Sequence, residues 1–243
     1  MRRLAPMVCA HRGRSGVAPE NTLAAFEAAI ELAVDFIECD VRRTSDGAIV
    51  LMHDAAVNRT TDGEGEVSAM SLEQIRALDA GSWKDESYAG ERVPTLAEAL
   101  EAVTPACVLD IEIKQRGIAE QVVEEVCAAD AIRRVSIVSF DLDDLRVAKA
   151  GEPRLACGWI SGGPEAEGRE GILALIDTAL EVGCNFVTCN HRAITEGFVY
   201  ECHVRGLALM AWTMDEEQDI RRQMELGVDA LVSNYPERVL ALL

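Results

Sequence analysis

The sequence has few aromatic and few basic residues. Phe, Trp and Tyr make up 5% of its 243 residues, and 23 Lys and Arg are outnumbered by 42 Asp and Glu, which gives a net charge of -19 at pH 7. A chain of this charge repels nucleic-acid phosphates and anionic lipid surfaces at long range. We therefore expect no nucleic-acid partner, and a substrate that carries phosphate has to find a local positive site.

Long hydrophobic runs are also missing. No apolar run approaches the roughly 18 to 20 residues that a membrane span requires. Arg2 and Arg3 stand near the start, but the apolar run after them stops at His11, which is too short for a signal peptide. We therefore expect a cytoplasmic protein without a membrane span.

The eight cysteines include no C-x-x-C pair. Five of them lie in apolar runs that resemble strands: Cys9, Cys39, Cys107, Cys157 and Cys189. Free cysteine behaves as a small hydrophobic residue, so this placement favours buried, reduced thiols over a disulfide framework. Zinc ligation by thiolates lacks the necessary spacing.

Short β-branched runs alternate with longer segments of helical period, which indicates parallel strands joined by crossover helices. The predicted strands are 7–11, 36–42, 49–53, 107–114, 135–140, 155–160, 185–189, 208–213 and 230–233. The predicted helices are 20–33, 95–103, 117–129, 141–149, 170–182, 195–205, 215–226 and 236–242. Predicted caps are Thr95 and Asp141 at helix starts, with Gly151, Gly183, Gly206 and Gly227 just past helix ends. The pattern is typical of the α/β class and of a (β/α)8 TIM barrel.

One predicted strand exceeds the eight of such a barrel. The link between residues 42 and 49 contains Asp46-Gly47 and is far shorter than the dozen residues that a parallel crossover needs. We therefore expect 36–42 and 49–53 to form an antiparallel hairpin. Pairing of 42 with 49 would bring His53 beside Glu38.

Residues 54–94 are rich in Gly, Glu, Ser and Thr and contain one predicted short helix at about 71–79. The segment is too long for an ordinary barrel loop. We expect a small inserted cap within a single domain that spans 1–243.

Acidic side chains share a face on two predicted strands. Alternate residues of a strand point the same way, which groups Glu38 with Asp40, and Glu112 with Asp110 and Lys114. Buried charges are costly unless they are paired or bind a metal, and barrel active sites lie at the carboxyl ends of the strands. The oxygen ligands of Glu38, Asp40 and Glu112 suit Mg²⁺, Ca²⁺ or Mn²⁺.

The alternative for these carboxylates is a structural ion-pair network with Arg12, Arg42 and Lys114. The two histidines at strand ends, His11 and His53, bear on the choice. Two imidazoles converging on the same carboxylates favour general acid and general base chemistry.

Several motifs together resemble the glycerophosphodiester phosphodiesterase family. They are A-H-R-G-R-S-G-V-A-P-E-N-T-L-A-A-F at 10–26, I-E-C-D-V-R-R-T-S-D-G-A-I-V-L-M-H-D at 37–54, N-R-T-T-D-G-E-G at 58–65, P-T-L-A-E-A-L at 94–100, I-E-I-K at 111–114, A-W-T at 211–213 and G-V-D-A-L-V-S-N-Y-P at 227–236. Each motif is short, but all of them occur in the right order over nearly the whole chain.

The resemblance implies a barrel with a small insertion and an enzyme that hydrolyses glycerophosphodiesters to glycerol 3-phosphate and an alcohol, usually with Mg²⁺ or Ca²⁺. The implied residues are metal ligands Glu38, Asp40 and Glu112, catalytic His11 and His53, phosphate-binding Arg12 and Lys114, and Trp212 in the substrate pocket. The family's frequent T-D-x-P motif is Ser233-Asn234-Tyr235-Pro236 here. One carboxylate is therefore absent at the last strand end, and the resemblance assigns no role to Asn234.

A charge count is consistent with this assignment. Three carboxylates, one divalent cation and one phosphodiester sum to two negative charges, which Arg12 and Lys114 neutralise. Two other functions remain open: a metal-dependent lyase or aldolase that stabilises an enolate, and a barrel that only binds phosphorylated ligands.

Overall fold

The computed structural model describes residues 5–104 and 106–243, so Arg2 and Arg3 lie outside the described residues. The strands are β1 (Met7–Ala10), β2 (Phe36–Arg43), β3 (Ile49–Leu51), β4 (Val108–Ile113), β5 (Val135–Ser139), β6 (Ala156–Ser161), β7 (Phe186–Asn190), β8 (Ala208–Trp212) and β9 (Ala230–Ser233). Neighbouring strands follow the order β1-β9-β8-β7-β6-β5-β4-β2-β3, and β1 also pairs with β2. All pairs are parallel except β2 with β3. Eight parallel strands thus close on themselves, which confirms the predicted TIM barrel.

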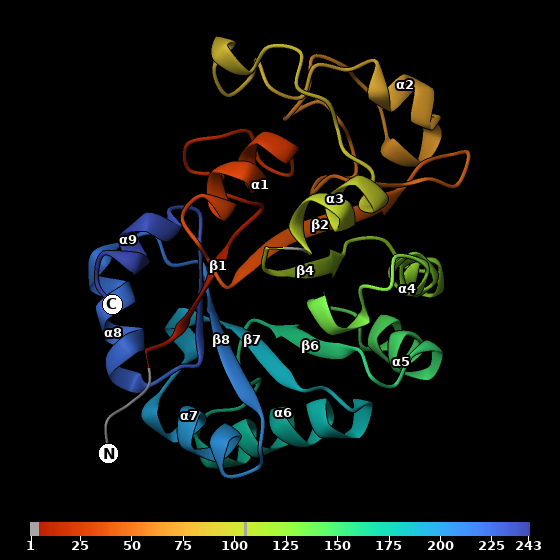
Figure 1. Cartoon of the computed structure of the whole chain (residues 1–243). Coiled ribbons are helices and arrows are strands. Elements are labelled where there is room, and N and C mark those ends of the chain that lie inside the picture. The colour runs from red at the N-terminus through yellow and green to blue at the C-terminus, as the bar shows by residue number, and fades with distance from the viewer. Residues whose placement is uncertain (1–4, 105) are drawn as a thin grey trace.

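Helices surround the strands (Figure 1). They are α1 (Leu23–Ile30), α2 (Leu72–Arg76), α3 (Leu96–Val103), α4 (Ala119–Ala128), α5 (Leu142–Gly151), α6 (Gly168–Val182), α7 (Glu196–His203), α8 (Glu217–Leu226) and α9 (Pro236–Leu240). Thr95 and Asp141 cap α3 and α5 as predicted. Gly183 and Gly227 end α6 and α8 in the left-handed conformation that glycine tolerates best. The prediction for Gly151 was wrong, because it is the last residue of α5 and does not lie past its end.

Two apolar layers follow from the alternation of side chains along the strands. The larger layer lies between strands and helices and includes Cys39, Leu109 and Ile111. The smaller cluster includes Cys9, Val138, Phe186 and Met210. Because side chains alternate along a strand, the residues next to Cys39 on β2, and those next to Leu109 and Ile111 on β4, face the barrel interior. Among these are the acidic side chains of β2 and β4.

The hairpin of β2 and β3 exists, but its register differs by one residue from the prediction. Arg42 pairs with Val50, and Arg43 with Ile49. The backbone N–H of Thr44 donates to Ala48 O at 2.9 Å, so the turn takes five residues, with Gly47 in the left-handed region. His53 is therefore not beside Glu38 in the ladder: the last pair is Val41 with Leu51, the Met52 N–H still donates to Asp40 O at 2.9 Å, and His53 lies beyond the end of β3.

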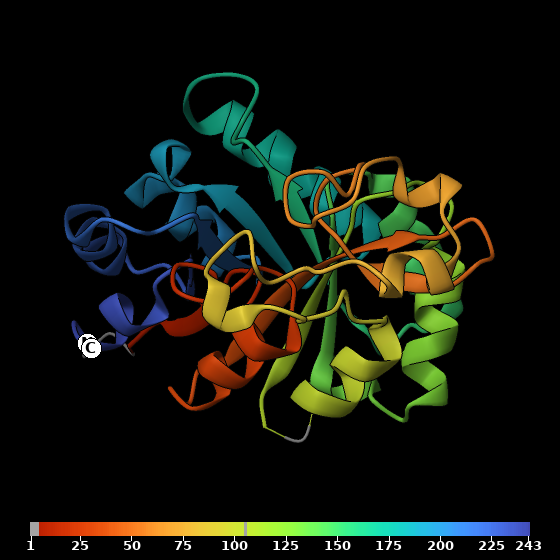
Figure 2. The same cartoon turned by 90° about the horizontal axis from the view of Figure 1, so that it is seen from above.

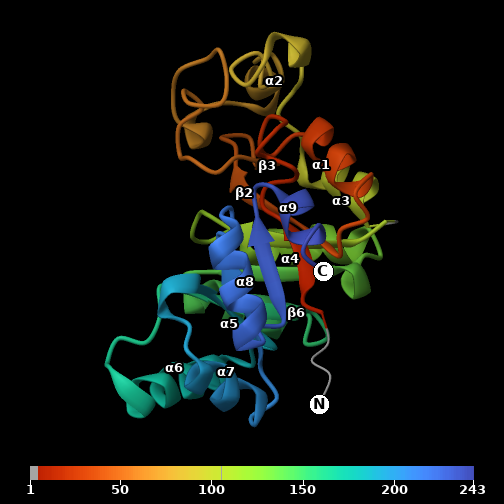
Figure 3. The same cartoon turned by 90° about the vertical axis from the view of Figure 1, so that its left-hand side faces the viewer.

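The segment between β3 and α3 contains a short core of its own. This core is formed by Val50 of β3 and six buried residues of the segment: Met52, Val57, Val67, Ile75, Ala80 and Val93. Two 3-10 turns, at Val67–Ala69 and Glu86–Tyr88, flank α2, which is shorter than the predicted 71–79. The segment, orange to yellow, lies outside the helix ring on the side opposite α6 and α7 (Figures 1 and 3). Figure 2 shows the same segment from above.

Two further observations concern the whole described chain. Among residues 5–104 and 106–243, no helix combines the length and the apolar character that crossing a membrane requires. All eight cysteines are free, and seven of them are buried, with Cys127 exposed.

Candidate active site

A pocket opens at the carboxyl ends of the barrel strands, where TIM barrels carry their chemistry. Its lining brings together seven of the eight predicted site residues: His11, Arg12, Glu38, His53, Glu112, Lys114 and Trp212. The eighth, Asp40, is fully buried beside them. Asp110, Val138, Phe140, Ile160, Thr188, Thr213 and Val232 complete the lining.

Three carboxylates lie close together at the pocket. Parallel pairing of β2 with β4 sets Asp40 opposite Glu112. Each of Glu38, Asp40 and Glu112 offers one oxygen within 4.8 Å of the others. Glu38 Oε1 and Asp40 Oδ1 are buried without a hydrogen bond from any described residue. Buried oxygens of this kind call for a partner, and the donor set fits a hard divalent cation.

The acidity of the carboxylates reflects their crowding. Burial, together with the charges of Asp40 and Glu112, raises the pKa of Glu38 well above its ordinary value. Burial and the charge of Asp40 raise the pKa of Glu112 to about 7. A bound cation would offset this repulsion and favour the ionised forms.

Two cationic side chains lie against the carboxylates. The Arg12 backbone N–H donates to Glu38 Oε2 at 2.9 Å, and its Nε lies 3.1 Å from Asp40 Oδ2. Lys114 Nζ lies 2.7 Å from Glu112 Oε1 and 3.7 Å from Asp40 Oδ1. Arg42 does not join them, because its guanidinium donates to His53 O at 2.7 and 3.0 Å. The predicted alternative network is thus wrong for Arg42.

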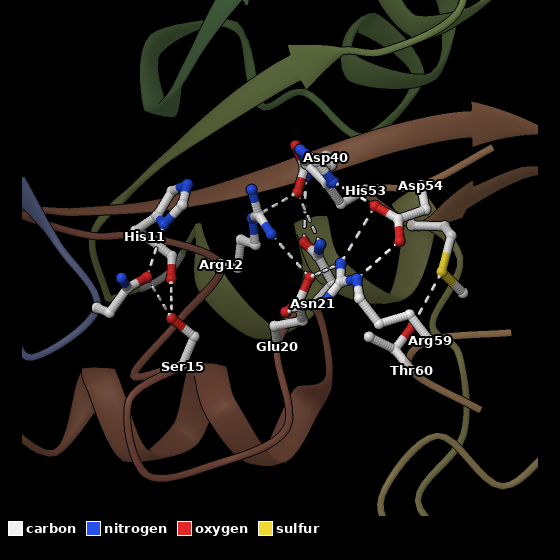
Figure 4. Close-up of polar contacts among 12 residues, drawn as sticks. His11, Arg12, Ser15, Glu20, Asn21, Asp40, His53, Asp54, Arg59 and Thr60 are labelled. Atoms are coloured by element: carbon white, nitrogen blue, oxygen red, sulfur yellow. Dashed lines mark hydrogen bonds and ion pairs between the residues drawn. The ribbon is translucent and has the colours of Figure 1, made fainter. Parts of the chain in front are cut away.

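The two histidines have different partners. His11 Nδ1 lies 2.7 Å from Asn234 Oδ1, and His11 Nε2 lies 3.8 Å from Glu38 Oε2. Burial and the charge of Arg12 lower the pKa of His11 to about 4. His53 Nδ1 lies 2.6 Å from Asp54 Oδ1. One imidazole is therefore held by a neutral amide and the other by the carboxylate of Asp54, which Figure 4 shows beside His53.

Aromatic side chains form one side of the pocket. Trp212 ends β8 and meets Phe140, which follows β5, edge to face with ring centroids 6.3 Å apart. The Lys114 ammonium lies 5.8 Å from the Phe140 ring centroid. Phe140 is 54% exposed, which leaves its ring available to a ligand. The sequence predicted Trp212 as a pocket residue but not Phe140, whose only signal was its place at a strand end.

The sequence model of the glycerophosphoryl diester phosphodiesterase family matches residues 11–238. The chain belongs to this family. A glycerophosphodiester phosphodiesterase of Caldanaerobacter subterraneus is 37% identical over 242 residues, which cover 97% of each chain. A second such enzyme, from Bacillus subtilis, is 30% identical and matches 95% of this chain and 84% of its own.

Solved structures agree with the family assignment. A phosphodiesterase of Oleispira antarctica, in complex with the product sn-glycerol-3-phosphate, superposes with a TM-score of 0.87 at 30% identity. The match covers 98% of this chain and 96% of that one. This member of the family is therefore an enzyme, a phosphoric diester hydrolase.

Five polar residues around the family's site escaped prediction: Glu20, Asn21, Asp54, Arg59 and Asp215. The first four lie inside motifs that carry the family resemblance, namely P-E-N-T, M-H-D and N-R-T-T. Asn21 Nδ2 donates to Asp40 Oδ2 at 2.8 Å and thereby leaves Oδ1 for a cation. Asp215 carried no signal, since its contacts come from the fold alone.

Proposed function

We propose that this chain hydrolyses glycerophosphodiesters to glycerol 3-phosphate and an alcohol with one bound divalent cation. The observation that supports this is that three carboxylates and two imidazoles meet at one pocket, and that two of the carboxylates each have a buried oxygen without a hydrogen bond from any described residue. The Oleispira antarctica relative, which holds sn-glycerol-3-phosphate, supports the same product here.

Glu38, Asp40 and Glu112 would hold the cation, with Mg²⁺ or Ca²⁺ as the first candidates and Mn²⁺ as a third. When bound, the cation supplies Lewis-acid polarisation of a phosphoryl oxygen. The carboxylates and the basic residues together set the charge of the site. Arg12 and Lys114 neutralise the negative charge that remains when a phosphodiester is bound, so they would bind its non-bridging oxygens.

The partners of the two histidines support different roles for them. Asn234 accepts from His11 Nδ1 and leaves Nε2 as a base that takes the proton of the attacking hydroxyl, whether of water or of the substrate's 2-hydroxyl. Asp54 Oδ1 lies 2.6 Å from His53 Nδ1, so the carboxylate would orient this ring with Nε2 left to donate a proton to the departing alkoxide. We therefore propose His11 as general base and His53 as general acid.

The aromatic wall would receive the carbon atoms of the substrate. Trp212 and Phe140 present ring faces and edges beside Lys114. Packing of a glycerol or alcohol carbon chain there would orient the phosphorus between the two imidazoles.

We also propose a domain organisation and a location. Residues 1–243 would form one domain with 54–94 as an inserted cap, which the separate small core supports. Eight free cysteines favour the reducing cytoplasm, where the reaction would link lipid to glycerol metabolism.

A substrate panel tests the function. Glycerophosphocholine, glycerophosphoethanolamine, glycerophosphoglycerol and bis(p-nitrophenyl) phosphate are each incubated with and without EDTA. Glycerol 3-phosphate is assayed enzymatically for the first three substrates, and released p-nitrophenolate is measured for the fourth. We expect hydrolysis that EDTA abolishes and Mg²⁺, Ca²⁺ or Mn²⁺ restores. Full activity of a metal-free preparation would contradict the cation site, and turnover of keto acids without phosphodiester hydrolysis would favour a lyase.

A further inference from the structure

Arg59, from the segment between β3 and α3, contacts two residues that flank the proposed catalytic groups. Its Nη1 and Nη2 donate to the two oxygens of Glu20, both at 2.8 Å. Its Nε donates to Asp54 Oδ2 at 2.7 Å. A single guanidinium thus holds two carboxylates in place, as Figure 4 shows.

Each of these carboxylates also contacts one proposed active-site residue. Glu20 Oε1 accepts from Arg12 Nη1 at 2.8 Å, while Asp54 Oδ1 lies 2.6 Å from His53 Nδ1. The result is a chain of alternating charge, Asp40–Arg12–Glu20–Arg59–Asp54–His53. It is electrically balanced when His53 carries a proton, and it reaches from the proposed cation site to that imidazole.

The cations of this chain favour the ionised forms of Glu20 and Asp54. Although burial alone would raise it, the bonds and charges of Arg59 and Arg12 lower the pKa of Glu20 to about 2. The hydrogen bond from Arg59 holds the pKa of Asp54 far below its ordinary value. Both carboxylates therefore stay ionised at neutral pH, so their oxygens accept hydrogen bonds and donate none.

The backbone that presents Arg59 is itself held. Thr60 and Thr61 are buried, and Thr61 Oγ1 donates to Val57 O at 2.8 Å. Val57 belongs to the small core of the segment and its N–H donates to Gly65 O at 3.0 Å. Arg59 therefore extends from a packed turn, which fixes the position from which its guanidinium reaches the two carboxylates.

We propose that Arg59 is a positioning residue through which the inserted segment orients both His53 and Arg12. This inference rests on the proposed function of those two residues. The fork fixes Asp54 so that its Oδ1 faces His53 Nδ1, and fixes Glu20 so that Arg12 keeps its approach to the phosphate. Without Arg59, two adjacent carboxylates would lose their shared cation and repel each other.

Kinetics of three variants test the proposal. Arg59→Gln should lower kcat by about 10²-fold, the cost of a small misplacement of a catalytic group, and should also raise KM through Arg12. Arg59→Lys keeps the charge but not the fork, so it should recover only part of the loss. Arg76→Gln is the matched control, because Arg76 also ties the segment to the barrel, through Glu98 at 2.6 Å; it should stay within about twofold of the parent, as a surface ion pair contributes little.

Nuclear magnetic resonance of the imidazoles gives a readout that does not depend on activity. The chain has four histidines, so their ring signals can be assigned by single substitution. In the parent, the Nδ1 proton of His53 should be far downfield because it is bound to a carboxylate. Arg59→Gln should broaden or remove that signal while the His203 signals, from α7, persist and report a folded chain. An unchanged His53 signal in Arg59→Gln would overturn the proposal.

A double-mutant cycle separates the two branches. If Arg59 acts on His53 through Asp54, then Arg59→Gln combined with Asp54→Asn should lower kcat no further than the worse single variant. Likewise, Arg59→Gln combined with Glu20→Gln should raise KM no further than the worse of the two single variants. Additive losses would show that Arg59 acts by another route. If the parent hydrolysed no glycerophosphodiester, the proposed function would fail, while the resonance experiment would still decide whether Arg59 positions His53.

Discussion

Asn234 Oδ1 accepts from His11 Nδ1 at 2.7 Å, and the same amide donates through Nδ2 to Asp215 Oδ2 at 2.6 Å. Asp215 also accepts from the Asn234 backbone N–H at 3.0 Å. The amide can therefore face His11 only with its oxygen. An acceptor is retained at the position where the related motif has a carboxylate, and Asp215 determines its orientation.

Removal of this acceptor should disturb His11. Asn234→Ala should lower kcat by about 10²-fold with little change in KM, because the ring loses its orientation and not its substrate contacts. Asn234→Asp combined with Asp215→Asn exchanges the amide and the carboxylate, so it should recover most of the activity that Asn234→Asp alone loses. Steady-state kinetics on glycerophosphoethanolamine measures both effects. Equal losses in the double and single variants would show that the acceptor alone does not position His11.

The second prediction concerns the cation. Glu112→Gln should weaken Mg²⁺ binding by at least about tenfold, since one of three charged ligands is lost, without unfolding the barrel. Asp110→Asn is a matched control, because Asp110 is also buried in the barrel but does not belong to the carboxylate trio of the proposed cation site. Its Oδ1 accepts a hydrogen bond from the Ser136 hydroxyl at 2.5 Å. Isothermal titration of both variants with Mg²⁺ measures the affinities. Comparable losses in the two would place the cation elsewhere.

The third prediction separates the two histidines. His11→Ala and His53→Ala should each lower kcat on glycerophosphodiesters by about 10² to 10⁴-fold, as expected for a lost base or acid. A p-nitrophenolate leaving group needs little protonation, so His53→Ala should regain much of its rate on bis(p-nitrophenyl) phosphate while His11→Ala should not. The reverse pattern would exchange the two roles. Equal impairment of both variants on both substrates would leave only a positioning role for one of them.

A fourth prediction concerns Arg12. Its guanidinium lies beside Asp40 and Glu20, and it would bind phosphate in the ground state and more strongly as charge develops. Arg12→Ala should therefore raise KM and lower kcat together. Arg42→Ala serves as a comparison, since the Arg42 guanidinium donates to the backbone oxygen of His53 and is not proposed to contact phosphate, so its loss should affect KM less. Michaelis curves for the two variants give the contrast.

The fifth prediction is a pH dependence of stability. Glu20 has its pKa lowered from 4.5 to about 2 in the fold. Its ionised form is therefore favoured by folding: the stabilisation is complete above pH 4.5 and is lost as the pH falls toward 2. One pKa unit corresponds to about 1.4 kcal/mol, so Glu20→Gln should cost roughly 3.5 kcal/mol at most at pH 7. Urea unfolding at several pH values should show the gap between parent and variant closing in acid, and a gap independent of pH would contradict the assignment.

Much of the fold was predictable because strand and helix periods differ and because caps such as Thr95 and Asp141 carry local signals. The register of the hairpin was not, since it depends on how many residues the turn takes, and Gly47 allows a turn of five. Strand alternation grouped Glu38 with Asp40 and set Glu112 on the inner face of its own strand, and the parallel pairing of β2 with β4 brings the three together.

Contacts between distant segments were the part that sequence could not supply. Arg59 and Glu20 lie 39 positions apart, and Asn234 and His11 lie 223 apart. Neither contact follows from a period: closure of the barrel brings Asn234 at the last strand beside His11 at the first, and the packing of the segment between β3 and α3 brings Arg59 to Glu20. The predicted set therefore included the groups that would meet substrate and omitted those that hold them.

The seven buried thiols can report local opening of the barrel, because each reacts only when it becomes exposed. Burial raises the pKa of Cys157, Cys189 and Cys202 to about 12, and alkylating reagents attack the thiolate. At neutral pH, therefore, only exposed Cys127 meets such a reagent in the closed barrel. Cys9 lies in the inner cluster and Cys39 in the layer beneath the helices. The order in which these two thiols are labelled would distinguish two routes of opening. Earlier labelling of Cys9 would indicate that the strands separate first, and earlier labelling of Cys39 would indicate that the helices detach first from the strands.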